Sequence, residues 1–172
     1  MPRRSHLFLL RHAHSSWASP GQRDHQRPLD ERGRKDASRL CEAIRRSGIA
    51  FDAIVCSSAT RATETLDGIR PALASDLPVE VSDDLYALGA EAYLAAAHRH
   101  GDRRALLLIG HNPMVEAVAR ALAPDGEADA SAAIAEGFPT CALARIGFDG
   151  SLQGIRPGDG FLEQVIVPRG RH

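Results

Sequence analysis

Arginine and histidine side chains follow three short apolar segments of this sequence, and these residue types suit anion chemistry. The pattern occurs at residues 7–10 before Arg11 and His12, at residues 53–56 before Arg61, and at residues 105–109 before His111. Guanidinium groups bind phosphate oxygens as forked donors. An imidazole titrates near neutral pH and can act as a nucleophile or base. Together these residues predict a site for a phosphoryl group.

The three apolar segments predict how these side chains come together. Short apolar runs are typical of strands buried on both faces of a parallel sheet. Ligands of open α/β sheets bind beyond the carboxyl ends of the strands, and right-handed crossovers bring those ends to one edge. Nearby helix N-termini favour anions there. Taken singly, Arg61 could be a solvated helix residue and His111 a capping or core histidine. Their recurrence at three successive strand ends favours the phosphate site.

The remaining pattern predicts a single domain over residues 1–172. We expect a three-layer α/β/α sandwich with a mostly parallel central sheet and a mixed or antiparallel edge strand. Helices are predicted at residues 31–47, from residue 62 to near Pro71, at 90–100 and at 113–122, and further strands at 79–81, 141–148 and 161–167. Asp30 is expected to cap the first helix and Gly48 to end it. Asn112 is expected as an N-cap with Pro113 at the first helical position, after a sharp turn at Gly110.

Composition bounds the function classes. The chain has 172 residues and a formal net charge of −1. Its hydrophobic fraction of 44% and charged fraction of 25% are typical of a soluble globular protein. This charge balance predicts no general polyanion-binding field, and no apolar segment approaches the length of about 20 residues of a membrane span. Cys41, Cys56 and Cys141 are scattered and predict buried free thiols in a reducing compartment. We therefore expect a cytoplasmic protein with no nucleic-acid or membrane partner.

Several motifs resemble those of the histidine phosphatase superfamily, whose signature is an Arg-His pair after the first strand. The matching segments are LLRHAHSS, SSATRATET and LLLIGHNP, in the order of the family. Within it, the chain looks most like the small SixA-like phosphohistidine phosphatases, because of its short length and the segments RPLDERGRKDA, FPTCALARIGFDG and VIVPRG. The resemblance implies that His12 is the nucleophile, that Arg11 and Arg61 hold the phosphoryl oxygens, and that His111 stabilises the transition state. It also implies a hydroxyl contact from Ser16.

The sequence departs from part of this family at the general acid. Phosphomonoesterases of the superfamily protonate an alkoxide leaving group with a carboxylic acid, which some carry directly after the second histidine. Here that position is Asn112. Other branches supply the acid after the middle strands, where Asp83, Asp84 and Glu91 are the candidates; their alternative interpretation is a turn or a solvated helix start. If the site has no general acid, the favoured substrate is phosphohistidine, because its imidazole leaving group needs no proton from such an acid.

Neither a metal nor another cofactor is expected. His12 and His14, and likewise His98 and His100, are spaced by one residue but lack carboxylate or cysteine partners at ligand spacing. We expect His14 to belong to the polar loop of residues 13–28. A connection of this length is typical of a functional loop or lid, in which Trp17 and Arg23 are the residues of interest.

The sequence thus predicts a metal-independent phosphatase that acts through a phosphohistidine intermediate on His12. Its expected partner is a protein carrying phosphohistidine. Two alternatives stay open: a phosphatase of small phosphomonoesters with the same mechanism, and a regulatory module that binds phosphate without turnover. A mutase is disfavoured because the chain has little room for insertions that would enclose a sugar bisphosphate.

Overall fold

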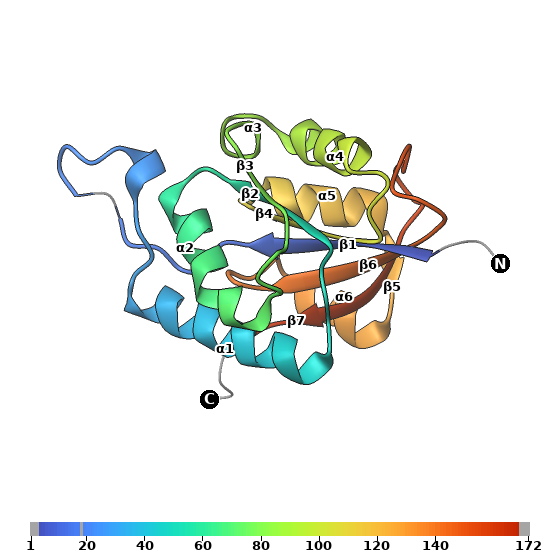
Figure 1. Cartoon of the computed structure of the whole chain (residues 1–172), viewed down its shortest axis with the longest axis horizontal. Helices are drawn as coiled ribbons and strands as arrows, with labels where there is room; N and C mark the ends of the chain where they lie inside the picture. The colour runs from blue at the N-terminus through green and yellow to red at the C-terminus, as the bar shows by residue number, and fades with distance from the viewer. Residues whose placement is uncertain (1–3, 18, 169–172) are drawn as a thin grey trace.

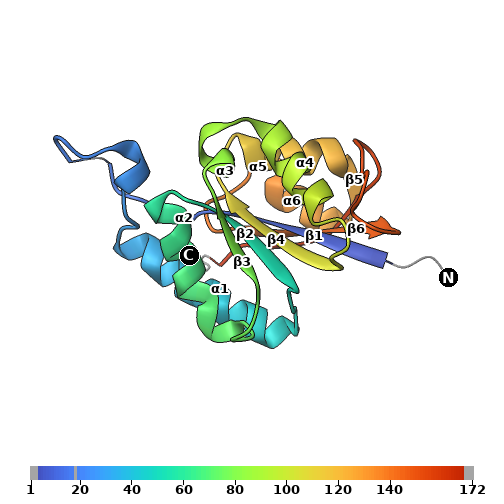
Figure 2. The ribbon, with the colours of Figure 1, turned by 45° about the horizontal axis from the view of Figure 1, so that its top comes forward.

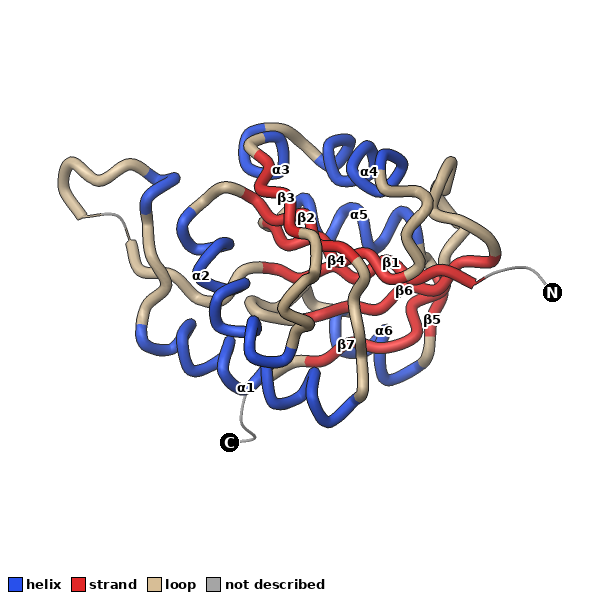
Figure 3. The backbone as a smooth tube through the Cα atoms, in the orientation of Figure 1, coloured by secondary structure: helices blue, strands red, loops and turns tan. Residues whose placement is uncertain are grey.

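The computed structural model describes residues 4–17 and 19–168, and within them seven strands form one sheet. The strands are β1 (Arg4–Arg11), β2 (Ala53–Ser57), β3 (Val79–Ser82), β4 (Ala105–Gly110), β5 (Asp125–Gly126), β6 (Leu143–Asp149) and β7 (Phe161–Ile166). Their order across the sheet is β3-β2-β4-β1-β6-β7-β5. Figure 3 shows these strands as a central layer between helices.

Helices cover both faces of the sheet. They are α1 (Glu31–Ser47), α2 (Thr60–Ile69), α3 (Asp84–Ala87), α4 (Ala90–Arg99), α5 (Met114–Leu122) and α6 (Ala128–Ile134), with two 3-10 turns, η1 (Asp24–Gln26) and η2 (Arg70–Ala72). Helices α1 and α2 pack on one face, whereas α4, α5 and α6 contribute to the core on the other (Figures 1 and 2). The predicted α/β/α sandwich is confirmed.

Strand β1 is central because its side chains are apolar on both faces. Leu7 and Leu9 belong to the core shared with α4 and α5, and Phe8 and Leu10 belong to the core shared with α1 and α2. All four are at most 4% exposed. β1 pairs in parallel with β4 on one side and antiparallel with β6 on the other. Burial on both faces explains the uninterrupted apolar run that precedes Arg11.

The antiparallel part of the sheet lies inside it and not at its edge. β6 is antiparallel to both β1 and β7, while β5 pairs in parallel with β7 at the outer end. At the opposite end β3 is the edge strand, as expected from its short, half-buried sequence. The sheet is therefore mixed, with its parallel half at β3, β2, β4 and β1.

Helix boundaries follow the predicted caps at α1 but not at α5. The Asp30 side chain accepts a hydrogen bond from the Gly33 N–H, and Gly48 ends α1 in the left-handed region at φ 70°. At α5 the Asn112–Pro113 peptide is cis, Pro113 takes the N-cap position and the helix begins at Met114. The expected assignment of Asn112 as N-cap and Pro113 as the first helical residue is therefore wrong by one position.

Gly110 has a different role from the sharp turn that its position suggested. It is the last residue of β4, and a Cβ atom added there would lie 2.0 Å from the Tyr93 hydroxyl oxygen. The absence of a side chain lets Tyr93 of α4 reach the strand end. Close packing, and not turn geometry, requires glycine at this position.

No helix in the described part of the chain is both long enough and apolar enough to cross a membrane.

Candidate active site

A cavity of about 520 Å³ opens at the edge of the sheet where β1 and β4 end. Its walls come from these strand ends, from the loop before α1 and from the first turn of α2. The lining residues are Arg11, His12, His14, Ser15, Ser16, Trp17, Arg27, Asp30, Arg61, His111, Asn112 and Thr140. The structure thus brings together all four residues that the three strand ends predicted, and Ser16 with them.

His12 is held at the junction of β1 and β4 in one tautomer. Its backbone N–H donates to the Gly110 carbonyl oxygen at 2.9 Å, which fixes the residue against the neighbouring strand. Its ring Nδ1 lies 2.7 Å from the Ala13 carbonyl oxygen. Because a carbonyl oxygen only accepts, Nδ1 carries the proton and Nε2 of the neutral ring keeps its lone pair. Nε2 is therefore the ring atom that can attack phosphorus.

His12 and His111 are neutral at pH 7. Burial is the largest influence on His12 and lowers the pKa of its imidazole to about 4, with the charges of Arg61 and Arg11 acting in the same direction. The hydrogen bond to Ala13 opposes this shift. Burial is also the main reason that the pKa of His111 falls to about 3, and the neighbouring His12 adds to it. Neutral His12 is the form that can act as a nucleophile.

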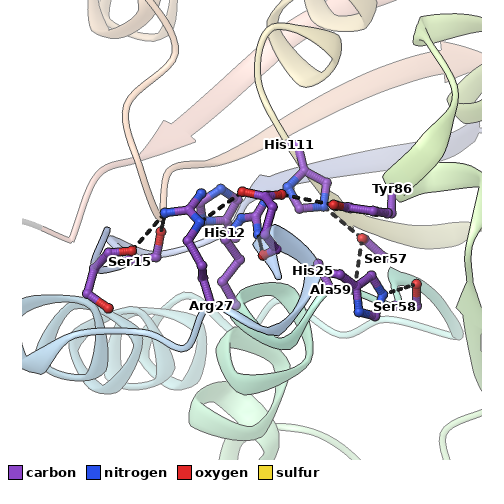
Figure 4. A network of polar contacts seen from close by, with 12 residues as sticks. His12, Ser15, His25, Arg27, Ser57, Ser58, Ala59, Tyr86 and His111 are labelled. Carbon is purple, nitrogen blue, oxygen red and sulfur yellow. Dashed lines mark hydrogen bonds and ion pairs between the residues drawn. The ribbon is translucent and has the colours of Figure 1, made fainter. Parts of the chain in front are cut away.

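His111 lies beside His12, with ring centroids 5.1 Å apart, and is 5% exposed. Its Nε2 is 2.7 Å from the Ser57 hydroxyl oxygen, which also accepts from the Ala59 N–H at 3.3 Å (Figure 4). Among the described residues, His111 Nε2 is the one acceptor recorded for the Ser57 hydroxyl proton. Ser57 therefore donates to Nε2, and neutral His111 carries its proton on Nδ1. Nδ1 is buried and has no hydrogen-bond partner among the described residues.

A buried tyrosine fixes the backbone of His111. The Tyr93 hydroxyl accepts from the His111 N–H at 2.9 Å and donates to the Leu85 carbonyl oxygen at 3.1 Å. Burial raises the pKa of this phenol to about 12, so it keeps the proton that it donates. Tyr93 reaches this point because Gly110 leaves the room for its ring.

The two predicted arginines approach from different elements. Arg11 ends β1 and donates from Nη1 to the Phe138 carbonyl oxygen at 2.7 Å. Arg61, in the first turn of α2, is 6% exposed and donates to Asp24 from both terminal nitrogens, at 2.8 Å to the backbone oxygen and 3.1 Å to Oδ2. Arg61 Nε is buried and has no partner among the described residues. Two fixed guanidinium groups beside two neutral imidazoles can bind a phosphoryl group.

A buried threonine connects the nucleophile segment to α2. The Thr65 hydroxyl accepts from the Ala13 N–H at 2.9 Å and donates to the Arg61 carbonyl oxygen at 2.7 Å. Thr65 is 0% exposed. It fixes the residue next to His12 relative to the helix that carries Arg61.

The loop before α1 adds two polar side chains, Asp24 and Arg27, that the strand-end pattern did not indicate. The Asp24 carboxylate accepts from Arg61, from Arg27 Nε at 2.9 Å and from the Tyr86 hydroxyl at 2.9 Å. Arg27 also donates to the Ser15 hydroxyl and to the Ser16 carbonyl oxygen. Figure 1 shows the loop projecting from this end of the sheet, and Figure 4 shows Arg27 and Tyr86 close to the histidine pair.

Comparison with known proteins shows the family of this chain. The model of the histidine phosphatase superfamily (branch 1) matches residues 7–91. A solved structure from Agrobacterium tumefaciens, assigned as the phosphohistidine phosphatase SixA, is 32% identical, with 86% of this chain and 93% of that chain covered and a TM-score of 0.76. The chain belongs to the histidine phosphatase superfamily.

Two further relatives match almost the whole of this chain, and the first of them, like the Agrobacterium tumefaciens structure, is a SixA protein. A structure from Nakamurella multipartitia, also assigned as SixA, is 25% identical and has a TM-score of 0.78. The match covers 99% of this chain and 100% of the Nakamurella chain. An uncharacterized protein of Mycobacterium tuberculosis, Rv1276c, is 36% identical over 93% of this chain and its own full length. The protein is thus a histidine phosphatase of the SixA-like branch.

The three carboxylates considered as general acids are not among the cavity-lining residues. Asp83 and Asp84 are exposed at the start of α3, and exposed Glu91 accepts from the Gly89 N–H at 3.3 Å. Tyr86, on the same short helix as Asp84, is the residue of this segment that reaches the site.

His14 lies in the polar loop, as expected, and it also lines the cavity. Its Nδ1 contacts the carboxylate of Asp30, which also caps α1. Trp17 lines the cavity mouth with 92% of its surface exposed, and Arg23 is exposed. Asp24 and Arg27 were missed because the loop has no periodicity. The available signal was their i, i+3 spacing, with Asp24 at the start of η1 and Arg27 at its C-cap.

Within the described ranges, no three His, Cys, Asp or Glu side chains lie close enough together to hold a metal ion. The pairs His12–His14 and His98–His100 do not gain the additional ligands that a metal site requires. His98 instead contacts the Ile155 carbonyl oxygen, and His100 contacts Glu80.

Proposed function

We propose that this phosphatase removes phosphoryl groups from protein phosphohistidine through a covalent intermediate on His12. The observation that carries the proposal is the fixed tautomer of neutral His12, whose Nε2 lone pair is left for attack by the Nδ1–H bond to Ala13. Arg11 and Arg61 would neutralise the phosphoryl oxygens, and the His111 Nδ1–H would donate to one of them. Phosphoryl transfer needs little more than such positioning and charge stabilisation.

The proposed reaction has two displacements. In the first, His12 Nε2 bonds to phosphorus, the P–N bond of the substrate breaks, and a neutral imidazole leaves with the N–H that it already carried. In the second, water attacks phosphorus, the bond to His12 Nε2 breaks and its electron pair returns to the neutral ring, and both protons of water stay with the released phosphate as H2PO4−. Both steps balance without a metal ion or another cofactor.

The charge state of two carboxylates at the site, Asp30 in the cavity wall and Asp24 in contact with Arg61 and Arg27, favours phosphohistidine over alkyl phosphates. Hydrogen bonds from Tyr86, Arg27 and Arg61 outweigh partial desolvation and lower the pKa of Asp24 to about 2. The pKa of Asp30 is also lowered, because hydrogen bonds from Gly33 and His14 outweigh desolvation. Both are ionised at pH 7, so neither holds a proton for a departing alkoxide. An imidazole leaving group needs no such proton.

The test offers three substrates to the purified protein, with and without EDTA. They are a phosphohistidine peptide, p-nitrophenyl phosphate and glycerol 2-phosphate. We expect kcat/KM to be highest for the phosphohistidine peptide and lowest for glycerol 2-phosphate, whose alkoxide is the poorest leaving group. EDTA is expected to leave all three rates unchanged.

Two results would reject the proposal. A preference for glycerol 2-phosphate would assign the protein to small phosphomonoesters and require an acid in the bound state. Loss of activity in EDTA, restored by a divalent cation, would reject the metal-independent mechanism.

A further inference from the structure

Asp24 is an unusual group to find in contact with an anion-binding arginine of a phosphatase. Its carboxylate carries a negative charge next to the position where the phosphoryl dianion is expected, and like charges repel. A carboxylate that only repelled substrate would weaken the reaction. Its contacts and exposure point to a second role.

Burial places Asp24 on the outer side of the site. The Arg61 side chain is 7% exposed, whereas the Asp24 side chain that contacts it is 54% exposed. His12, the attacking group, follows the carboxyl end of β1 on the inner side of the site. In an in-line displacement the leaving group departs on the side opposite the nucleophile. The leaving group therefore departs toward the solvent side, where Asp24 lies.

The Asp24 carboxylate has a free acceptor position on this side. Oδ2 accepts from Arg61 and from Tyr86, whereas Arg27 Nε is the one recorded donor to Oδ1 among the described residues. A carboxylate accepts about four hydrogen bonds. Oδ1 can therefore take a further N–H.

Aromatic rings border the same carboxylate. The ring of Tyr86 packs edge-on against His25 at 4.7 Å and against His111 at 5.8 Å (Figure 4). His25 is itself held by the Ser58 hydroxyl at 2.9 Å. A planar imidazole leaving group matches this combination of aromatic surface and carboxylate, whereas an alkoxide gains nothing from either.

We propose that Asp24 is a specificity residue that recognises the leaving imidazole of phosphohistidine by accepting its ring N–H. This inference rests on the proposed function and names the part of the site that selects its substrate. The carboxylate favours the N–H form of the phosphorylated ring, from which neutral imidazole can depart. With p-nitrophenyl phosphate it has no such partner and only repels the dianion.

The experiment compares Asp24→Asn with the unmodified protein on two substrates. Asparagine keeps the side-chain size and one acceptor oxygen for Arg61 and Tyr86, but removes the charge. We expect kcat/KM for a phosphohistidine peptide to fall about tenfold or more, as for loss of a charge-assisted hydrogen bond. We expect kcat/KM for p-nitrophenyl phosphate to rise. The matched control Asp67→Asn removes an exposed carboxylate from the same helix as Arg61, where it pairs with Arg70, and should change neither rate.

A second measurement does not depend on phosphohistidine turnover. Free imidazole should inhibit p-nitrophenyl phosphate hydrolysis competitively, and about tenfold more weakly in Asp24→Asn, with sodium chloride at matched ionic strength as the control. Equal losses on both substrates, or equal inhibition by imidazole, would reduce Asp24 to a loop anchor. If the unmodified protein does not act on the phosphohistidine peptide, the proposed function fails, and imidazole competition still decides the role of Asp24.

Discussion

His12 should remain neutral, the form that can attack phosphorus, at pH values well below those at which an ordinary histidine is protonated. Burial lowers the pKa of His12 from 6.5 to about 4 and the pKa of His111 to about 3. At pH 5.5 a histidine with a pKa of 6.5 is about 9% neutral, whereas one with a pKa of about 4 is about 97% neutral. The structure therefore predicts about tenfold more competent enzyme at pH 5.5 than an exposed histidine would allow.

Imidazole NMR of the 15N-labelled protein measures this directly between pH 3.5 and 8, with His12→Gln used to assign the resonance. The 15N shifts of His12 should report a neutral ring down to about pH 5. In that ring Nδ1 should carry the proton, as the hydrogen bond to Ala13 requires. Titration of His12 near pH 6.5, or protonation at Nε2 in the neutral ring, would refute the reasoning.

The same shifts set the sign of a stability change. The folded pKa values of His12 and His111 lie below their unfolded values, so the unfolded state binds more protons between pH 6.5 and about 4 for His12, and down to about 3 for His111. The free energy of unfolding should therefore fall as pH decreases through this window and should not depend on these groups above it. Urea titrations at pH 7.5 and 5 compare the two conditions.

Three substitutions test other parts of the site. Ser57→Ala removes the donor that fixes the tautomer of His111 and should lower kcat about tenfold or more, measured by steady-state kinetics, with the protein still folded; an unchanged kcat would reject the tautomer assignment. Asn112→Ala removes a side chain that accepts from the Glu116 N–H and donates to the Phe138 carbonyl oxygen, each at 3.2 Å. It should cost about 1 kcal/mol of stability in urea, with turnover largely retained; a catalytic collapse would show a direct role. Gly110→Ala forces a Cβ atom against the Tyr93 hydroxyl and should lower both the melting temperature and activity, whereas wild-type values for both would contradict the packing.

The predicted strands and the four strand-end residues depend on short segments of the chain, which is why the sequence was sufficient for them. An uninterrupted apolar run followed by a cation is a local pattern, and the right-handed crossover rule then places the strand ends together. The cap at Asp30 and the stop at Gly48 are equally local.

The rest of the site depends on contacts between distant segments. Asp24 meets Arg61 across 37 residues and Tyr86 across 62, and no periodicity in the loop marks it. The reason for glycine at position 110 likewise lies in Tyr93, on a different element. Such pairings follow from tertiary packing and could not be derived from local spacing.

Trapping of the phosphoenzyme tests the central claim most directly. The protein is mixed with 32P-labelled phosphohistidine peptide and quenched in alkali within milliseconds, in parallel with His12→Ala and, as a neighbouring control in the same cavity, His14→Ala. We predict an acid-labile, alkali-stable label on the unmodified protein and on His14→Ala, and none on His12→Ala. A label that persists in His12→Ala, or turnover by the unmodified protein with no trapped label, would contradict the mechanism.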